Sequence, residues 1–132
     1  MREIQLSTER KTQLLDITGE VRTALGSGAE GSAALVYVPH TTAGVVINEK
    51  IDPDLLGDFE AALTRIVGED WDWKHVDADG PNAPSHVRAS LVGPQVLVPL
   101  NGGELALGTY QGIFFCEFDG PRSRKVYVAT LI

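Results

Sequence analysis

Short β-branched runs dominate the chain and are interrupted by three stretches with helical periodicity. Alternating apolar and polar residues predict strands over 2–7 and 11–18, joined by a turn at 8–10. Short apolar runs predict further strands, giving about eight in all. The clearest of these runs are 32–39, 44–49, 95–100, 113–118 and 125–132. Most neighbouring strands are expected to pair as antiparallel hairpins.

Three segments carry helix signals. A short helix is predicted from Thr18 to Gly26. The segment 52–68 begins with a capping Asp52 and with Pro53 at the first helical position, and its apolar residues recur at three and four. A third helix is predicted over 82–93. Strands and helices in this order predict an α+β fold of one domain, with two or three helices.

Composition narrows the class of partner. The formal net charge is −7 and the isoelectric point is near 4.8, which argues against nucleic acid or an anionic membrane as a general partner. The single cysteine, Cys116, excludes an internal disulfide and fits a reducing compartment. The chain shows no signal-peptide pattern and no apolar run near the length of a membrane span. A cytoplasmic protein is therefore expected.

The three histidines all lie where the predicted chain bends. His40 follows Pro39 at a strand end, His75 lies in the polar segment 69–82, and His86 lies in the first turn of the third helix. Neutral imidazole is the commonest metal ligand, and three imidazoles with an open position make a catalytic zinc site. The spacing matches no local metal motif, so hydrogen-bonded surface histidines remain the alternative.

The segment CEFDGPRSR, residues 116–124, places two acids and two arginines around a predicted turn. Glu117 and Asp119 fall on one face of the strand, and Arg122 and Arg124 share a face beyond the turn. Because the strand is apolar on both sides, Glu117 needs a partner or a shifted pKa. Two interpretations stay open: a structural ion pair across a hairpin, or an arginine pair that binds phosphate or carboxylate.

Two other segments of the sequence have structural explanations. Asn48 and Glu49 precede the helix that begins near Asp52, where a carboxylate interacts favourably with the helix dipole. The glycine-rich segment 101–112 has neither P-loop nor dinucleotide-binding spacing, so its glycines are assigned to turns.

Four blocks in chain order resemble the YjbQ-like family, also described as secondary thiamine-phosphate synthase enzymes. They are HTTAGVVINE, a histidine in the polar loop, DGPNAPSHVRASLVG and LALGTYQGIFFCEFDGPRSR. The resemblance extends from about Ile4 to Ile132. It implies a single domain over 1–132 with a mostly antiparallel, β-sandwich-like core, assembled as a homotrimer with a polar pocket near the subunit interface. Tyr110 and Gly44 stand where the family commonly has tryptophan and a bulkier residue, which affects pocket shape.

The same resemblance implies roles for individual residues. The implied ligands of a divalent metal ion, zinc by expectation, are His40, His75 and His86. The implied catalytic residues are His40, Glu49, Glu117, Arg122 and Arg124. The implied substrate-binding residues are Thr41, Thr42, Asn48, Asn82 and Asp119.

The implied activity is that of a thiamin phosphate synthase, which joins a pyrimidine methyl pyrophosphate to a thiazole phosphate and releases pyrophosphate. The chain has no aspartate-rich magnesium cluster, which leaves open that this activity is secondary. One alternative is a metal-dependent hydrolase of a small phosphorylated compound. The other is a non-enzymatic trimer that binds a metabolite or a metal.

Overall fold

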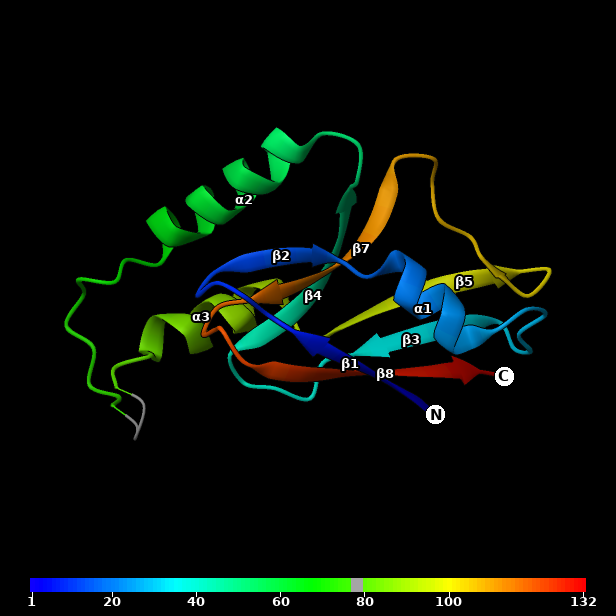
Figure 1. Cartoon of the computed structure of the whole chain (residues 1–132), viewed down its shortest axis with the longest axis horizontal. Coiled ribbons are helices and arrows are strands. Elements are labelled where there is room, and N and C mark those ends of the chain that lie inside the picture. The colour runs from blue at the N-terminus through cyan, green and yellow to red at the C-terminus, as the bar shows by residue number, and fades with distance from the viewer. Residues whose placement is uncertain (77–79) are drawn as a thin grey trace.

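In a computed structural model that describes residues 1–76 and 80–132, two antiparallel sheets pack face to face, with three helices around them (Figure 1). The strands are β1 Arg2–Ser7, β2 Gln13–Asp16, β3 Ala33–Tyr37, β4 Ala43–Glu49, β5 Gln95–Asn101, β6 Glu104–Leu105, β7 Gln111–Glu117 and β8 Ser123–Leu131. The helices are α1 Thr18–Leu25, α2 Pro53–Ile66 and α3 Ala83–Val92. The predicted α+β fold with an antiparallel sandwich core is confirmed.

The pairing of the strands differs from the predicted series of hairpins. One sheet has the order β1-β8-β3-β5-β6 and the other has the order β2-β7-β4. The expected β1–β2 hairpin is wrong, because β1 pairs with β8 and β2 pairs with β7. Among the described strands, only β5 and β6 are chain neighbours that pair directly. The other short connections cross from one sheet to the other, so each sheet is built from strands distant in sequence.

The main core fills the space between the two sheets. Val36 on β3 and Val126 on β8 face Val45 on β4 and Phe115 on β7, and all four side chains are buried. Helix α1 adds the buried side chain of Val21 to the same cluster. On β3 and β8 these residues alternate with more exposed positions, which directs one face of the five-stranded sheet inward. Strand β7 is buried at every position from Gly112 to Glu117, because both faces of the three-stranded sheet are covered.

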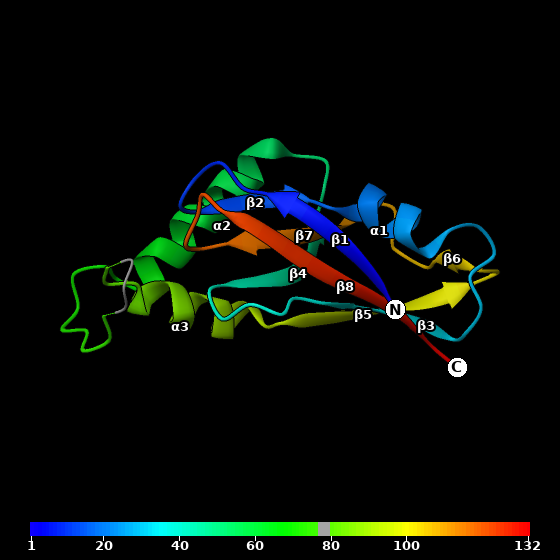
Figure 2. The same cartoon turned by 60° about the horizontal axis from the view of Figure 1, so that its bottom comes forward.

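A second, smaller core lies on the other face of the three-stranded sheet, beneath α2 and α3 (Figure 2). Leu14 on β2 and Cys116 on β7 contribute to it from the sheet, and Leu63 and Ala89 contribute from the two helices. Burial raises the pKa of the Cys116 thiol far above its usual range, so this cysteine is a packed, unreactive side chain.

Helix α2 begins as its sequence predicts. The Asp52 carboxylate accepts a hydrogen bond from the backbone N–H of Asp54 at 2.9 Å, which caps the helix. Fewer apolar residues of α2 are buried than the spacing in the sequence predicts. Leu63 is buried, whereas the Ile66 side chain is 60% exposed. The helix therefore contacts the sheet through one narrow face.

Helix α3 lies close to β4 because Gly44 has no side chain. A Cβ atom at Gly44 would lie 2.6 Å from the carbonyl oxygen of Gly93, just beyond the helix end. The same carbonyl accepts a hydrogen bond from the N–H of Val45 at 3.1 Å. Glycine at this position fixes how near α3 approaches the sheet, and the first turns of α3 carry His86.

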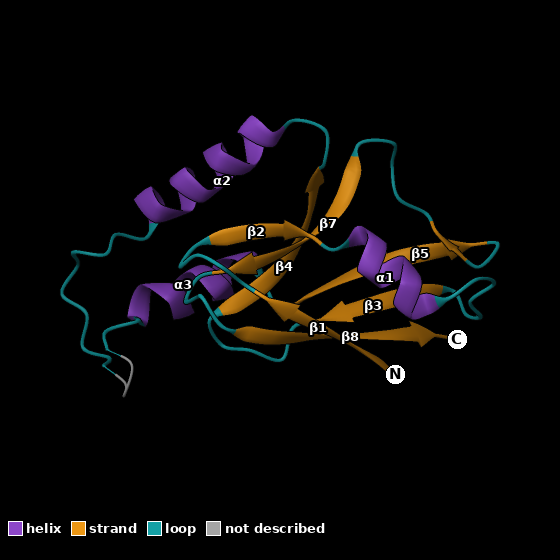
Figure 3. Ribbon diagram, in the orientation of Figure 1, coloured by secondary structure: helices purple, strands orange, loops and turns teal. Residues whose placement is uncertain are grey.

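The helices leave the outer face of the five-stranded sheet uncovered (Figures 2 and 3). Apolar side chains on this face are exposed. Leu97 on β5 is 56% exposed and Tyr37 on β3 is 39% exposed, and Leu131 on β8 is 42% exposed. Leu35 and Tyr127 lie between these residues in the strand register. We call the surface formed by these five residues the outer apolar face. Within the described residues, no helix has the length and apolar character needed to cross a membrane.

Candidate functional site

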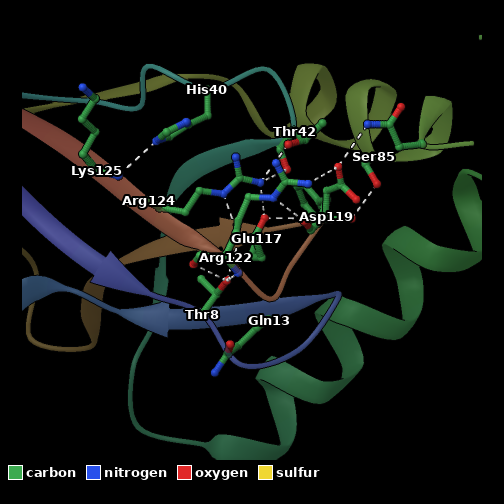
Figure 4. A network of polar contacts seen from close by, with 12 residues as sticks. Thr8, Gln13, His40, Thr42, Ser85, Glu117, Asp119, Arg122, Arg124 and Lys125 are labelled. Carbon is green, nitrogen blue, oxygen red and sulfur yellow. Dashed lines mark hydrogen bonds and ion pairs between the residues drawn. The ribbon is translucent and has the colours of Figure 1, made fainter. Parts of the chain in front are cut away.

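Three short connections between the sheets meet at one end of the sandwich. They carry Thr8 between β1 and β2, Thr42 between β3 and β4, and the turn 119–122 between β7 and β8. The side chains of Glu117 on β7 and Arg124 on β8 point between the sheets at this end (Figure 4). The candidate site is built around this buried pair.

Glu117 and Arg124 form a two-point ion pair. The Nε of Arg124 donates to Oε1 of Glu117 at 2.8 Å, and its Nη2 donates to Oε2. The side chains are 0% and 3% exposed, respectively. The pairing prediction is therefore correct, but the pair joins two sheets and does not span a hairpin, because β7 and β8 belong to different sheets.

Two threonines complete the shell of hydrogen bonds around the pair. The hydroxyl of Thr8 donates to Oε1 of Glu117 at 2.7 Å and accepts from the backbone N–H of Arg122 at 3.0 Å. The hydroxyl of Thr42 accepts from Nη2 of Arg124 at 2.8 Å. Each connection between the sheets is thus attached to the pair.

The electrostatics of Glu117 follow from these contacts. Burial by itself raises the pKa of a carboxyl group, because it removes water from the charged form. Hydrogen bonds from Arg124, Thr8 and the N–H of Asp119 outweigh burial and hold the pKa of Glu117 below its usual value. Glu117 is therefore an anion at neutral pH, and it neutralises the charge of Arg124.

A second polar group lies at the rim of the site, around Asp119. Its carboxylate accepts hydrogen bonds from Nδ2 of Asn82 and Nη2 of Arg122, each at 3.0 Å. The Nε of Arg122 donates to the backbone carbonyl of Asp119 at 2.8 Å. Asn82, Asp119 and Arg122 were predicted as site residues, and the structure brings these three together.

His40 lies beside this network and borders a cleft of about 400 Å³. Its Nε2 accepts a hydrogen bond from the backbone N–H of Lys125 at 3.0 Å (Figure 4). Because that nitrogen accepts, the neutral ring carries its proton on Nδ1. Partial burial and the nearby Arg124 guanidinium lower the pKa of His40, so the ring is neutral at pH 7. The cleft is lined by Glu3, Gln5, Leu6, Ser7, His40, Ser123, Arg124 and Lys125.

The three histidines lie in series along adjoining hollows of the surface. His40 and His86 both line a hollow of about 300 Å³, together with Thr41 and Ser90. His86 and His75 line the next hollow, of about 320 Å³. The rings of His75 and His86 meet edge to face, with centroids 4.9 Å apart.

This arrangement does not place the three predicted metal ligands around one point. Within 1–76 and 80–132, no three His, Cys, Asp or Glu side chains are positioned to hold one ion. One nitrogen of His40 is also occupied by the Lys125 amide. The described residues therefore do not show the three histidines as one ligand set, and the metal site stays a prediction.

Asn48 and Glu49 are the predicted site residues that the fold separates from the others. They pair with Gly112 and Gln111 at one end of β4, whereas Ala43, at its other end, pairs with Glu117. Six residues of strand span about 20 Å. Within one protomer these two side chains cannot share a ligand with His40.

Sequence reasoning missed three polar residues of this region. Thr8 holds Glu117, and the hydroxyl of Ser85 donates to the Phe118 carbonyl at 2.5 Å, which fixes the start of α3 to β7. Arg88 is buried and donates to the Val67 carbonyl and the Glu69 carboxylate. The sequence signal for Arg88 was a charged residue one helical turn from the apolar Pro84 and Val92.

Chemically, the cleft offers several hydrogen-bond donors and one exposed cation. The Lys125 amine, the hydroxyls of Ser7 and Ser123 and the neutral His40 ring can all donate to an anion. The Arg124 guanidinium borders the same cleft but is held by Glu117. The Glu3 carboxylate lines the same cleft, so an anionic group would be bound at the end that carries Lys125 and these donors.

Comparisons with known proteins agree in both sequence and structure. A family model described as UPF0047 protein YjbQ-like matches residues 2–132. The UPF0047 protein YugU of Bacillus subtilis is 42% identical, over 99% of this chain and 98% of its own. The UPF0047 protein MJ1081 of Methanocaldococcus jannaschii is 40% identical, over 96% of this chain and 91% of its own.

Solved structures give the same result. A YjbQ/UPF0047 protein from Clostridium acetobutylicum is 43% identical and superposes with a TM-score of 0.90, covering 98% of both chains. The Thermus thermophilus protein TT1486 is 31% identical with a TM-score of 0.88, covering 99% of this chain and 100% of its own. The match extends over the strands and turns that build the buried pair and the cleft, and this chain belongs to the YjbQ-like UPF0047 family.

Proposed function

We propose that the cleft beside His40 binds a small phosphorylated metabolite and that the protein catalyses a thiamin-phosphate-synthase-like transfer on it. The observation that carries the proposal is the lining of the cleft, where Lys125 and Arg124 border the same space as the neutral His40 ring. Its volume of about 400 Å³ lies in the range of small-molecule sites.

The proposed reaction breaks the bond between the pyrimidine methylene carbon and the pyrophosphate oxygen, and the thiazole nitrogen forms a new bond to that carbon. Pyrophosphate leaves with the bonding electron pair, so the site must stabilise growing negative charge. We assign that role to the Lys125 amine, with the hydroxyl of Ser123 and Nδ1–H of His40 as further donors. Glu117 neutralises the charge of Arg124, so we assign Arg124 a structural role in the wall of the cleft.

We further propose that the protein assembles as a homotrimer through the outer apolar face. Exposed Leu97, Tyr37 and Leu131 on adjacent strands form an apolar surface of a kind that marks contact sites. Assembly through a second copy also offers a way to bring Asn48 and Glu49 near the cleft of another protomer, where they would orient the pyrimidine.

The two alternatives remain distinguishable proposals. A non-enzymatic binding protein is favoured by one observation: both arginines near the turn are engaged by carboxylates, which leaves Lys125 as the main cation of the cleft. A hydrolase of phosphorylated compounds requires a water nucleophile and a general base. His40 would serve as that base only after its Nε2 released the hydrogen bond from the Lys125 amide.

The test combines binding and turnover on the same protein. Isothermal titration calorimetry with inorganic pyrophosphate and with the thiazole phosphate measures affinity, and chromatography measures thiamin phosphate formed from the two substrates. We expect Lys125→Ala to weaken pyrophosphate binding about tenfold or more. Lys74→Ala is the matched control, because Lys74 is exposed in the loop before α3 and borders a different surface.

The outcomes separate the three functions. Thiamin phosphate formation that falls in Lys125→Ala and persists in Lys74→Ala supports the transferase. Release of phosphate from simple phosphoesters without the pyrimidine substrate supports the hydrolase. Anion binding without either reaction supports the binding protein, and no binding of either anion by the wild type overturns the proposal.

A further inference from the structure

We propose that the cleft beside His40 binds a ligand with two different ends, an anionic group near Lys125 and an amino group at the Glu3 carboxylate. Glu3 is then a specificity-determining residue, which favours phosphorylated compounds that carry an amino group over those that do not. This inference rests on the proposed function in one respect, since it takes this cleft as the anion site. It adds the chemical class of the ligand and does not depend on which reaction follows.

The register of β1 and β8 arranges the outward side chains in three rows across the two strands. The rows are Ser7 with Ser123, Gln5 with Lys125, and Glu3 with Tyr127. The residues between them, such as Ile4 and Val126, are buried on the opposite face. Two residues of strand separate neighbouring rows, so the rows are about 7 Å apart. The cleft therefore has the two hydroxyls at one end, Lys125 in the middle and the Glu3 carboxylate at the other end.

The two opposite charges of the cleft are close but do not neutralise each other. Glu3 and Lys125 are diagonal neighbours on the two strands, a relationship that places Cβ atoms about 7–8 Å apart. Among residues 1–76 and 80–132, no ion pair joins them. The Glu3 carboxylate accepts a hydrogen bond from the Gln5 side chain at 3.4 Å, and the Lys125 amine lies 5.9 Å from the centre of the Tyr127 ring. Each charge therefore contacts a neutral neighbour, and both remain accessible to a ligand.

Three charged residues line this cleft, and two of them determine its electrostatic pattern. Arg124 is neutralised by the buried Glu117 carboxylate. Lys125 and Glu3 therefore give the two ends of the cleft opposite potentials. A purely anionic ligand is attracted by Lys125 and repelled by Glu3. A ligand that also carries an amino group at the Glu3 end is attracted at both ends.

The side chain of Gln5 lies between these two charges and can serve either end of a ligand. Its amide group has both a hydrogen-bond acceptor and two donors, so it can accept from an amino group or donate to an anionic oxygen. The spacing of the rows also sets the length of the ligand. Its anionic group and its amino group should lie about 7 Å apart, which corresponds to a short carbon chain or one small ring between them.

The experiment compares two probes that differ in one group. Butyl phosphate and aminobutyl phosphate differ only in the terminal amino group, so the ratio of their affinities measures the contribution of that group. Nuclear magnetic resonance titration of the isotope-labelled full chain gives each Kd, and the backbone amides of Gln5 and Lys125 report whether the probe lies in the cleft. Low salt is used because exposed charges are screened. We expect the wild type to bind aminobutyl phosphate about fivefold more tightly than butyl phosphate.

The variant Glu3→Gln removes the charge and keeps the shape of the side chain. It should weaken binding of aminobutyl phosphate by about fivefold and should slightly strengthen binding of butyl phosphate, because the repulsion is lost. A purely structural role of Glu3 would weaken both probes alike. Glu104→Gln is the matched control, because Glu104 is also exposed but lies on β6, at the opposite edge of the same sheet. This control should keep the preference of the wild type.

The possible results separate this inference from the proposed function. A preference for aminobutyl phosphate that is lost in Glu3→Gln and kept in Glu104→Gln supports the assignment of Glu3. Equal affinity of the two probes for the wild type, with signal changes in the cleft, would overturn this inference and leave the anion site intact. A preference that persists in Glu3→Gln would also overturn it. No binding of either probe by the wild type would overturn both this inference and the proposed function.

Discussion

Glu117 on β7 and Arg124 on β8 form a buried two-point ion pair that joins the two sheets where three connections cross between them. Buried ion pairs are often no more stabilising than well-packed apolar residues, because both charges lose their hydration. This pair contacts Thr8 and Thr42, one from each of the other connections. We infer that the pair favours the observed connections between the two sheets over other strand pairings. It also shapes the wall of the cleft.

Loss of one partner of this pair should destabilise the protein strongly. Glu117→Gln leaves the Arg124 guanidinium buried without a counter-charge, and the free energy of unfolding should fall by about 3–5 kcal/mol. Urea unfolding followed by circular dichroism measures the change. The double variant Glu117→Gln/Arg124→Met should recover part of the loss, because it removes the uncompensated charge.

The exposed ion pair between Asp72 and Lys74 provides the matched control. Both side chains are more than 80% exposed, and their charged atoms are 2.8 Å apart. Asp72→Asn should change stability by less than about 1 kcal/mol, since exposed pairs contribute little. A loss in Glu117→Gln no larger than in this control would mean that the buried charge is hydrated and that its role is not structural.

Stability should decrease with acid in two steps assigned to His40 and Glu117. The pKa of His40 is lower in the folded protein than its ordinary value of 6.5, so the unfolded chain binds the proton first. Stability then falls as the pH drops below 6.5 and levels off below the folded pKa. The pKa of Glu117 in the folded protein is also lower than its ordinary value of 4.5, so a second decrease begins below pH 4.5.

Unfolding measured from pH 8 to pH 3 tests both steps. His40→Gln should remove the upper step and leave the lower one, and Glu117→Gln should remove the lower one. Nuclear magnetic resonance titration of the His40 ring gives its pKa directly. A value above 6.5 would contradict the proposed effect of burial and of Arg124.

The difference between what the sequence predicted and what the fold contains has a physical origin. Helix α2 was predictable because Asp52 and Pro53 act locally, and its cap is present as expected. Strand pairing was not predictable from the sequence. A short polar connection can join two paired strands of one sheet, and it can equally join two strands of different sheets. The ion pair was anticipated from a buried carboxylate near arginines, but its neighbour Thr8 lies 109 residues from Glu117.

The same limit applies to the histidines. The resemblance implies that the three histidines are grouped, but sequence spacing carries no information on distances between rings. In the three-dimensional structure, His40 accepts a hydrogen bond from a backbone amide, whereas His75 contacts His86.

A charge on the outer apolar face should prevent assembly. In the proposed trimer, Leu97→Glu would bury a carboxylate against apolar side chains, so the variant should elute as a monomer, and light scattering coupled to size-exclusion chromatography measures its mass. Leu91→Glu is the control, because Leu91 on α3 is 59% exposed, close to the 56% of Leu97, but lies on another face. A wild-type monomer, or a Leu97→Glu variant with unchanged mass, would count against this interface.

Gly120, in the turn between β7 and β8, should tolerate no side chain. A Cβ atom there would lie 2.8 Å from the hydroxyl of Thr8 and 2.9 Å from Cγ of Glu117, and it would also meet the Arg10 carbonyl. Gly120→Ala must therefore push the β1–β2 connection away from the ion pair, with an expected loss of about 1–3 kcal/mol. Gly57→Ala is the opposite control: a Cβ atom in the middle of α2 meets nothing within 4 Å, and alanine there should stabilise by about 1 kcal/mol. Equal stability of the two variants in urea would mean that the turn can move without disturbing Thr8 and Glu117.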